Sequence, residues 1–185
     1  MAIRPSVCGS TLMAESLDLG IFPQKRVRHV QQTEMTECGL ACLTMIASYH
    51  GLNIDMAVMR RRFVPSLRGA SLRSLMNIAD RLGFTSRAVR VELDDIGALA
   101  VPTVLYWNLN HYVVLEKVSG KKALIHDPAG SSSWMRLSEV SKFFTGVALE
   151  IEPTSDFEKG DVYQRLRLSK LWTRIRGLKR AAAQT

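Results

Sequence analysis

Cys38 and Cys42 stand four positions apart in the stretch TECGLACLTMIASYHG, residues 36–51. A zinc site needs about four thiolate or imidazole ligands, and the sequence has no second pair of such residues at ligand spacing. A disulfide within one helix would strain the Cβ directions and would link no separate elements. The pattern therefore favours two free thiols, either as small buried side chains or with one of them as a nucleophile.

The residues around these cysteines predict a helix over residues 38–50, which gives the two thiols different surroundings. The helix has a wide apolar face that includes Cys42, and a glycine follows its last residue. Residues 36–37 form the cap region, so Cys38 lies in the first turn, where unpaired N–H groups and the helix dipole favour an anion. A free thiol has a pKa of about 8.5, which a helix N-terminus and a nearby imidazolium lower. We therefore expect Cys42 to be a buried side chain and Cys38 to be the nucleophile.

A thiolate nucleophile needs a histidine partner, and the sequence offers His29, His50, His111 and His126. His111 opens the strand pattern HYVVLEKV, and ALIHDP follows after the turn SGKK. A hairpin centred near residues 119–121 places Asp127 across from about residues 111–113, and an even register puts Asp127 on the face of His111. Asp127 then accepts the Nδ1–H of His111 and fixes its tautomer.

The other histidines fit this role less well. Side chains alternate along a strand, so His126 points to the face opposite Asp127. His29 precedes the cysteine by nine residues on a short segment without a carboxylate neighbour, so we expect a surface or edge residue. His50 belongs to the cysteine helix and lies on a different face of it from the two thiols.

The oxyanion of an acyl-transfer intermediate needs hydrogen-bond donors. One is the backbone N–H of Cys38, and the side-chain amide of Gln31 or Gln32, just upstream, is a second candidate. The spacing alone does not choose between the two glutamines. A cysteine at a helix start and a histidine on a later sheet form the papain-like arrangement.

The remaining patterns predict an α+β fold in which helices come first and an antiparallel sheet follows. Apolar periodicity indicates helices over residues 71–83 and, more briefly, 56–63. Short β-branched segments then alternate with turn residues, at 85–93, 102–107, 111–118, 122–128 and 146–152. One more helix fits residues 137–144, and residues 1–25 read as a loose extension with one helical turn near residues 12–17.

The composition is that of one globular domain in a reducing compartment. The 185 residues are 46% hydrophobic and 23% charged, and three cysteines are too few for a disulfide scaffold. The N-terminus lacks an apolar core of signal-peptide length. The uncharged run 96–115 contains Pro102, Asn108 and Asn110, so it predicts buried strands rather than a membrane span. These features favour a cytoplasmic domain.

The net charge of +8 is concentrated near the C-terminus. Residues 161–185 hold seven Lys or Arg and one Asp, which gives +6, so the rest of the chain carries only +2. One face of this tail, read as a helix, is apolar and consists of Leu168, Leu171, Trp172, Ile175 and Leu178. A basic amphipathic helix is typical of a membrane surface. The balanced body argues against nucleic acid as a partner.

Five motifs occur in an order that resembles the bacteriocin-processing peptidase domain. They are QTEMTECGLACLTMIASYHGL, LRGASLRSLMNIADRLGF, VPTVLYWNLNHYVVLEKV, HDPAG and FFTGVALEIEP. This papain-like cysteine peptidase domain stands at the N-terminus of ABC exporters for double-glycine-leader peptides, and the resemblance is to the colicin V exporter branch in particular. It covers residues 26–155, which leaves residues 1–25 as an N-terminal extension and residues 156–185 as a linker and basic amphipathic helix.

The resemblance implies a role for each of four residues. Cys38 matches the nucleophile, Gln32 the oxyanion-hole glutamine, His111 the general base and Asp127 the acid that orients it. The family cleaves leader peptides after Gly-Gly or Gly-Ala, and the peptidase step uses no cofactor. The rival expectation is a peptidase-like module that docks cargo without cutting it, as in relatives that have lost the cysteine.

The resemblance also implies partners and a place in the cell. Full-length members continue into a membrane domain and an ATPase that binds ATP, whereas this sequence has no P-loop motif. We therefore expect the N-terminal portion of an exporter, whose substrate is a leader-bearing precursor peptide. The basic helix would lie at the cytoplasmic face of the bacterial inner membrane, just before a first transmembrane helix.

Overall fold

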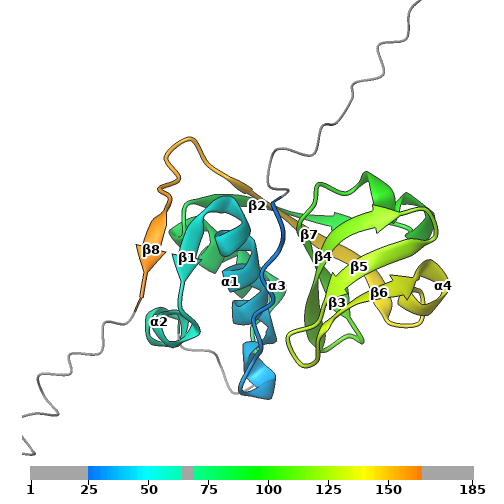
Figure 1. Cartoon of the computed structure of the whole chain (residues 1–185), viewed down its shortest axis with the longest axis horizontal. Helices are drawn as coiled ribbons and strands as arrows, with labels where there is room; N and C mark the ends of the chain where they lie inside the picture. Colours follow the sequence, from blue (N-terminus) through cyan, green and yellow to red (C-terminus); the bar gives the residue numbers. More distant parts are fainter. Residues whose placement is uncertain (1–24, 64–68, 164–185) are drawn as a thin grey trace, which may run out of the picture.

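The structure, a computed structural model, describes residues 25–63 and 69–163. The helical turn predicted near residues 12–17 and the basic amphipathic helix predicted in the C-terminal tail therefore lie outside the described residues, apart from the tail's first positions. Figure 1 shows two halves, with helices on one side and a twisted sheet on the other. This arrangement confirms the predicted α+β class.

Three helices form the helical half, at the positions that the apolar patterns predict. They are α1 (Cys38–His50), which follows the 3₁₀ helix η1 (Met35–Glu37), α2 (Met56–Arg62) and α3 (Leu72–Arg81). Side-chain caps set two of the starts, because Asp55 accepts the N–H of Ala57 and Ser71 accepts the N–H of Ser74. Gly51 closes α1 with a φ of 100°, in the left-handed region that glycine tolerates best.

The second half is a six-stranded antiparallel sheet with the strand order β2-β7-β3-β4-β5-β6. Its strands are β2 (Phe84–Arg90), β3 (Thr103–Trp107), β4 (His111–Ser119), β5 (Lys122–His126), β6 (Ser132–Arg136) and β7 (Phe144–Pro153). The sequence predicts all of them except β6, whose SSWMR segment is mostly exposed and has no apolar alternation. The helix expected over residues 137–144 is the single turn α4 (Leu137–Val140), and a 3₁₀ helix, η2 (Leu93–Ala98), precedes β3.

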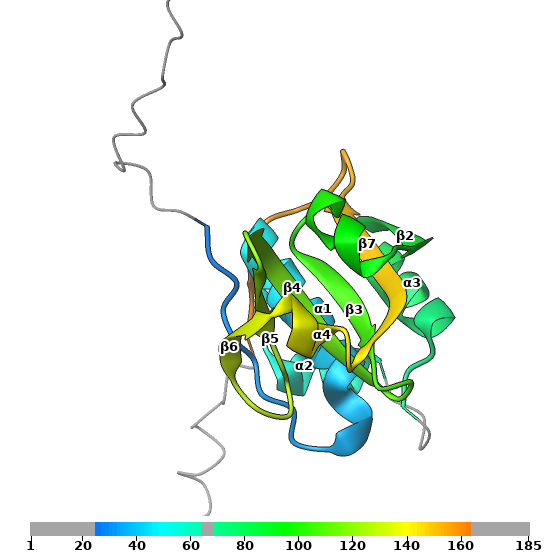
Figure 2. The same ribbon diagram turned by 90° about the vertical axis from the view of Figure 1, so that its right-hand side faces the viewer.

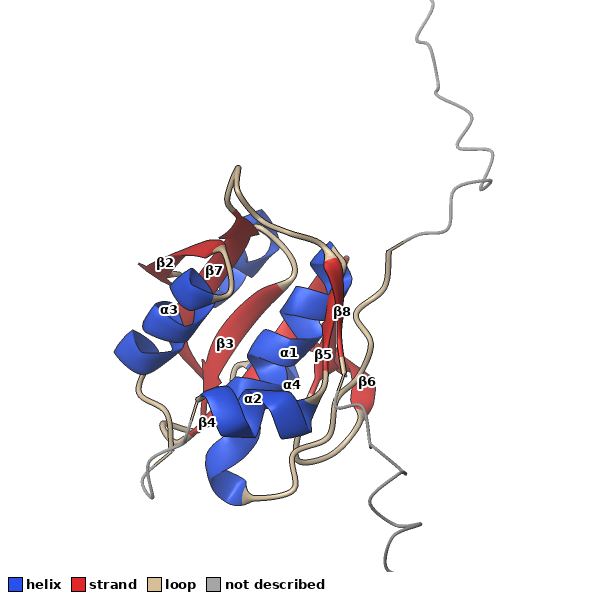
Figure 3. Ribbon diagram, turned by 90° about the vertical axis from the view of Figure 1, so that its left-hand side faces the viewer, coloured by secondary structure: helices blue, strands red, loops and turns tan. Residues whose placement is uncertain are grey.

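Both faces of the sheet are covered, so alternate residues of its strands enter two separate cores. Val104 and Val114 pack against α1, α2 and α3 on one face, which Figure 3 shows with the helices in front. Leu105 and Val113 pack with residues of η2 and α4 on the other face, which is turned toward the viewer in Figure 2. Residues 38–47 of α1 are buried without interruption, so this helix forms the centre of the molecule.

The uncharged run 96–115 enters the sheet, as the sequence predicts. It contains β3 and the first half of β4, and most of the side chains in these strands are buried. Over residues 25–63 and 69–163, no helix has the length and hydrophobicity to cross a membrane.

A second, two-stranded sheet brings the end of the described chain back to the helical half. Its strands β1 (Leu52–Ile54) and β8 (Gly160–Val162) run parallel. The backbone N–H of Asp55 donates to the carbonyl of Val162 at 3.2 Å, and the Asn53 amide donates to Asp161 at 2.8 Å. The segment predicted as a linker and basic amphipathic helix from residue 156 thus contains a strand, which extends to Val162.

Candidate active site

Cys38 is the first residue of α1 and is buried, with 4% of its surface exposed. Both helix cysteines are free thiols, and Cys42 lies wholly inside the core, as the apolar pattern predicts. Burial, together with the negative charges of Cys38 and Asp127 when ionised, raises the pKa of the Cys42 thiol well above its usual range. Cys42 is therefore held as a neutral thiol, which leaves Cys38 as the nucleophile candidate in this helix.

His111 and Asp127 form an ion pair at the end of the sheet that faces α1. The imidazole Nε2 lies 2.7 Å from Asp127 Oδ1, and 18% of the His111 side chain is exposed. The predicted pairing of these two residues is confirmed, but the predicted ring atom is wrong, because Nε2 and not Nδ1 faces the carboxylate. Since Nε2 faces Asp127, Nδ1 is the ring nitrogen that remains available to another partner.

A β-bulge at Glu116 brings the two residues of this pair to the same face. At the turn, Ser119 pairs with Lys122, but beyond the bulge Leu115 pairs with Ile125. Without the extra residue, Asp127 would stand opposite residue 114 and would face away from His111. With the bulge, the register continues to residue 113, which has the parity of His111.

His126 points to the opposite face from Asp127, as the alternation of side chains predicts. Its Nε2 donates to Glu116 Oε2 at 2.7 Å, and its Nδ1 lies 2.6 Å from the Ser132 hydroxyl. Burial lowers the pKa of His126, although the hydrogen bond with Glu116 opposes this effect. A neutral ring then accepts a hydrogen bond from the Ser132 hydroxyl at Nδ1. His126 therefore has a structural role, in which it links Glu116 to Ser132.

The segment before α1 lies along the edge of this site and is tied to the loop that follows β5. His29 is not the plain surface or edge residue that the sequence suggests, because its Nε2 donates to the backbone carbonyl of Asp127 at 2.9 Å. The N–H of Val27 donates to Glu116 Oε2 at 3.3 Å, and the N–H of Gln32 donates to the Pro128 carbonyl at 2.9 Å. These bonds fix Gln32 beside the His111–Asp127 pair.

The two candidate glutamines differ in their surroundings. Gln31 is exposed, whereas Gln32 is half-buried and lines a cavity of about 660 Å³ together with His111 and Asp127. The Oε1 atom of Gln32 is buried and has no hydrogen-bond partner among the described residues. The unpartnered atom is an acceptor, so the donor that an oxyanion needs is the Nε2 end of the same amide.

The charges at the site keep the imidazole protonated at neutral pH. Burial on its own lowers the pKa of His111, but hydrogen bonds with Asp127 and Cys38, and the negative charges of both groups, raise it to about 9. The hydrogen bond from His111 holds the pKa of Asp127 below its usual range, against the effect of burial. The cation at His111 and the anion at Asp127 thus stabilise one another.

Sequence reasoning did not single out the ion pair next to Cys38 between the buried Glu37 and the partly exposed Arg60. The only signal was an acidic residue directly before the cysteine, which reads equally well as an ordinary helix cap. Over the described residues, no group of three or more His, Cys, Asp or Glu side chains is arranged to hold a metal ion. His50 contacts the ring of Phe84 at the far end of α1, away from the two thiols.

Comparison with known proteins identifies the family. The model of the Peptidase C39 family matches residues 26–156. This chain belongs to the Peptidase C39 family. Among its relatives is the colicin V secretion/processing ATP-binding protein CvaB of Escherichia coli, 43% identical over 161 residues that make up 87% of this chain and 23% of CvaB. The probable microcin-H47 secretion/processing ATP-binding protein MchF of the same organism shows the same identity and coverage.

Solved structures give the same assignment for the peptidase fold. A double glycine motif protease from an AMS/PCAT transporter, crystallised with the leader peptide, is 30% identical, with a TM-score of 0.66 over 70% of this chain and 94% of that one. The peptidase domain of Streptococcus ComA shares the fold, with a TM-score of 0.64 at 24% identity over 70% of this chain and all of that one. As a C39 peptidase domain, the chain is a papain-like cysteine peptidase, so the resemblance in its motifs is confirmed.

Proposed function

We propose that this C39 domain removes the leader peptide of an exported precursor by cutting after a Gly-Gly or Gly-Ala pair. The observation that carries the proposal is the free, buried Cys38 at the start of α1 beside the His111–Asp127 pair. The leader peptide bound to the double glycine motif protease supports this substrate class. The chain spans 23% of the length of CvaB and MchF.

The four residues take successive parts in the proposed reaction. The Cys38 thiolate attacks the carbonyl carbon of the second small residue, and the negative charge moves to the carbonyl oxygen. The Gln32 amide and the N–H of Cys38 donate to this oxyanion. His111, held by Asp127, gives its proton to the leaving amine, so the peptide bond breaks and the leader remains as a thioester. His111 then takes a proton from water, whose oxygen displaces the thiolate.

Two cavities flank the catalytic residues and offer room for the two parts of the substrate. The cavity of about 660 Å³ contains Gln32, and a second one of about 620 Å³ lies toward the helical half. The lining of the second cavity includes the apolar side chains of Ala70, Leu72, Tyr106, Leu109, Tyr112 and Val147. Such a groove suits the apolar face of a helical leader, whereas the buried position of Cys38 favours residues with no side chain or only a methyl group at the cut.

The proposed partners follow from the exporters that the family serves. The precursor peptide is the substrate, and the membrane and ATPase domains of an exporter are the covalent partners, with ATP bound only by the ATPase domain. The peptidase step uses no cofactor, and nucleic acid is not a partner. The basic tail is proposed to lie at the cytoplasmic surface of the inner membrane, where Lys and Arg interact with anionic lipids.

The decisive test is cleavage of a synthetic precursor by the isolated chain. We expect mass spectrometry to show a single cut after the second glycine of a leader that ends in Gly-Gly. A control peptide with valine in place of the second glycine should remain intact. A chain that binds the leader, measured by calorimetry, but leaves it uncut would be the docking module instead.

The Gln32→Ala variant is expected to lower kcat by about 10²–10³, the usual effect of one lost oxyanion donor. The KM should change little, because the oxyanion exists only in the transition state and the intermediate. Gln31→Ala is the matched control, since Gln31 is exposed and is not among the residues that line the cavity. A large loss in Gln31→Ala beside a fully active Gln32→Ala would reverse the assignment.

A further inference from the structure

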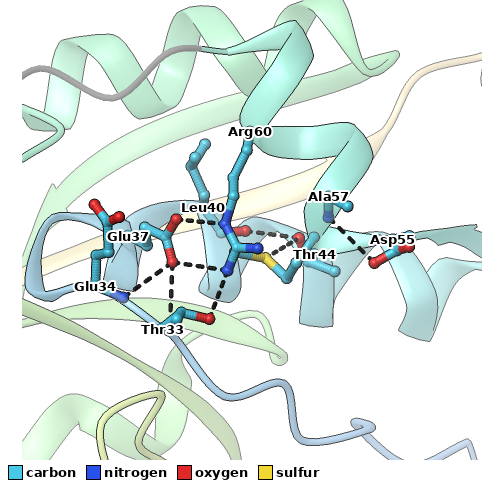
Figure 4. Close-up of polar contacts among 9 residues, drawn as sticks. Thr33, Glu34, Glu37, Leu40, Thr44, Asp55, Ala57 and Arg60 are labelled. Atoms are coloured by element: carbon cyan, nitrogen blue, oxygen red, sulfur yellow. Dashed lines mark hydrogen bonds and ion pairs between the residues drawn. The ribbon is translucent and has the colours of Figure 1, made fainter. Parts of the chain in front are cut away.

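The carboxylate of Glu37 gathers four hydrogen bonds, although only 2% of this residue is exposed. Its Oε2 accepts the backbone N–H groups of Thr33 at 3.1 Å and Glu34 at 3.2 Å. Arg60 donates from Nε to Oε1 at 2.5 Å and from Nη2 to Oε2 at 3.0 Å. Figure 4 shows the guanidinium reaching down from its helix to this carboxylate and to the Thr33 hydroxyl, which it contacts at 2.7 Å.

These bonds join the two ends of the short segment 33–37, which connects the two oxyanion donors of the proposed reaction, Gln32 and Cys38. Thr33 and Glu34 directly follow Gln32, and Glu37 directly precedes Cys38. The carboxylate therefore folds the segment back on itself, so that its first and last residues are tied together. The segment is also tied at its start, where the N–H of Gln32 donates to the carbonyl of Pro128. The backbone of Gln32, which carries the side-chain amide donor, is thus held on both sides, by Pro128 and by Glu37.

Arg60 reaches this segment from helix α2, which is capped at its start and packed against the core. Its helix α2 begins at an Asp55 cap, and Met59, one residue before Arg60, is fully buried. The hydroxyl of Thr44 in α1 contacts the sulfur of Met56 at 3.3 Å, so the start of α2 rests on the helix that carries the nucleophile. The guanidinium is consequently fixed relative to Cys38 and not only relative to the surface of the protein.

We propose that Arg60 is a positioning residue for peptide cleavage: through the Glu37 carboxylate it holds the Gln32 amide at the right distance from the backbone N–H of Cys38. The inference rests on the proposed function and extends it to a residue that touches no substrate. Oxyanion stabilisation depends on donors that are already in place when the charge develops. A displacement of about 1 Å at such a site can cost about 10²-fold in rate.

The chemistry of the pair explains why an arginine stands here. A buried carboxylate without a cationic partner is strongly unfavourable, and a planar guanidinium can serve both of its oxygens at once. Without Arg60, the carboxylate keeps only the two backbone N–H groups and is drawn toward water, which pulls residues 33–34 with it. The hydrogen bond from Arg60 is also the main reason that the pKa of Glu37 lies below its usual range, so the carboxylate stays ionised at neutral pH.

The test compares Arg60→Met with Arg87→Met, in a second ion pair whose carboxylate is also buried but whose arginine side chain is 77% exposed, against 36% for Arg60. Arg87 donates to Oε2 of the buried Glu150 from Nη2 at 2.6 Å and from Nε at 3.1 Å, and Glu150 also accepts the backbone N–H of Ala100. This second pair lies on β2 and β7, which do not line the cavity that contains Gln32. Both variants should melt at a lower temperature than the wild-type chain. Only Arg60→Met should lower kcat, by about 10–10² and with KM changed less than about threefold.

A double-mutant cycle then separates positioning from general loss of structure. If Arg60 acts through Gln32, adding Arg60→Met to Gln32→Ala should cost less than about threefold in kcat, because the amide to be positioned is already gone. Arg60→Lys keeps the charge but not the two-pronged geometry, so its kcat should lie between those of wild type and Arg60→Met. It replaces Arg60→Met in the cycle if that variant does not fold.

The outcomes distinguish this inference from the function on which it rests. A wild-type chain that cuts no Gly-Gly leader would overturn the proposed function and the inference together. An active wild-type chain with an unchanged kcat in Arg60→Met would overturn the inference alone. Equal kcat losses in Arg60→Met and Arg87→Met, or full additivity with Gln32→Ala, would also overturn it, because either result would reduce Arg60 to a stabilising residue.

Discussion

The Cys38→Ala variant is expected to lose all measurable cleavage of a Gly-Gly leader while it still binds the leader. Loss of the nucleophile in a comparable hydrolase costs about 10⁶ in kcat, because the remaining groups have no bond to form with the substrate. Binding should survive, since the second cavity, which is proposed to receive the leader, includes no atom of Cys38 in its lining. The measurements are product formation by mass spectrometry and leader affinity by calorimetry on the same preparation.

Cys42→Ser provides the matched control for this variant. It should keep substantial activity and lose stability, because a buried thiol becomes a buried hydroxyl that needs a hydrogen-bond partner. A thiol reagent at neutral pH should mark Cys38 first, since Cys42 is fully buried and its pKa is raised by that burial. Preferential labelling of Cys42 or of Cys8, or cleavage that survives in Cys38→Ala, would overturn the assignment of the nucleophile.

The sequence predicted the helices and most of the sheet because their signals are local. The start of α3 at a serine cap and the end of α1 at a glycine depend on neighbouring residues alone. The same holds for Cys38, whose place in the first turn follows from where the helix begins. Strand β6 and the parallel pair β1–β8 were not predicted, since short exposed strands are defined by distant partners and not by their own pattern.

The site shows the same division between local and distant causes. The pairing of His111 with Asp127 was predicted by assuming an even register, and the structure achieves that register through a bulge at Glu116 that leaves no local mark in the sequence. The contact of His29 with the Asp127 carbonyl joins residues 98 positions apart, so no spacing rule finds it. The Glu37–Arg60 pair was not predicted from the sequence for the same reason, because its partners are 23 positions apart and on different helices.

The second large effect is expected at His111 and Asp127, where both the rate and its pH dependence should respond. His111→Ala removes the general acid and base, which typically contribute about 10²–10⁴ in rate, and also the cation that stabilises the Cys38 thiolate. Its loss should therefore lie at or above the top of that range. Asp127→Asn should lose less, because the amide still accepts the hydrogen bond of the imidazole but supplies no negative charge.

The pH profile separates a charge effect from simple misfolding. The imidazolium of His111 is the form that protonates the leaving amine, and the pKa of His111 is about 9. In the wild-type chain, kcat/KM should therefore stay high through neutral pH and fall as the pH rises through about 9. In Asp127→Asn, the charge that raises this pKa is gone, so the alkaline fall should begin at a lower pH.

His126 supplies the control for the same experiment, since it lies next to Asp127 in the chain but faces the other way. His126→Ala leaves Glu116 buried without its histidine partner, so we expect a lower melting temperature. The alkaline limb of its kcat/KM should nevertheless coincide with that of the wild-type chain, because the His111–Asp127 contact is untouched. An alkaline limb that moves in His126→Ala and stays fixed in Asp127→Asn would show that the wrong histidine, and the wrong face of β5, had been assigned to catalysis.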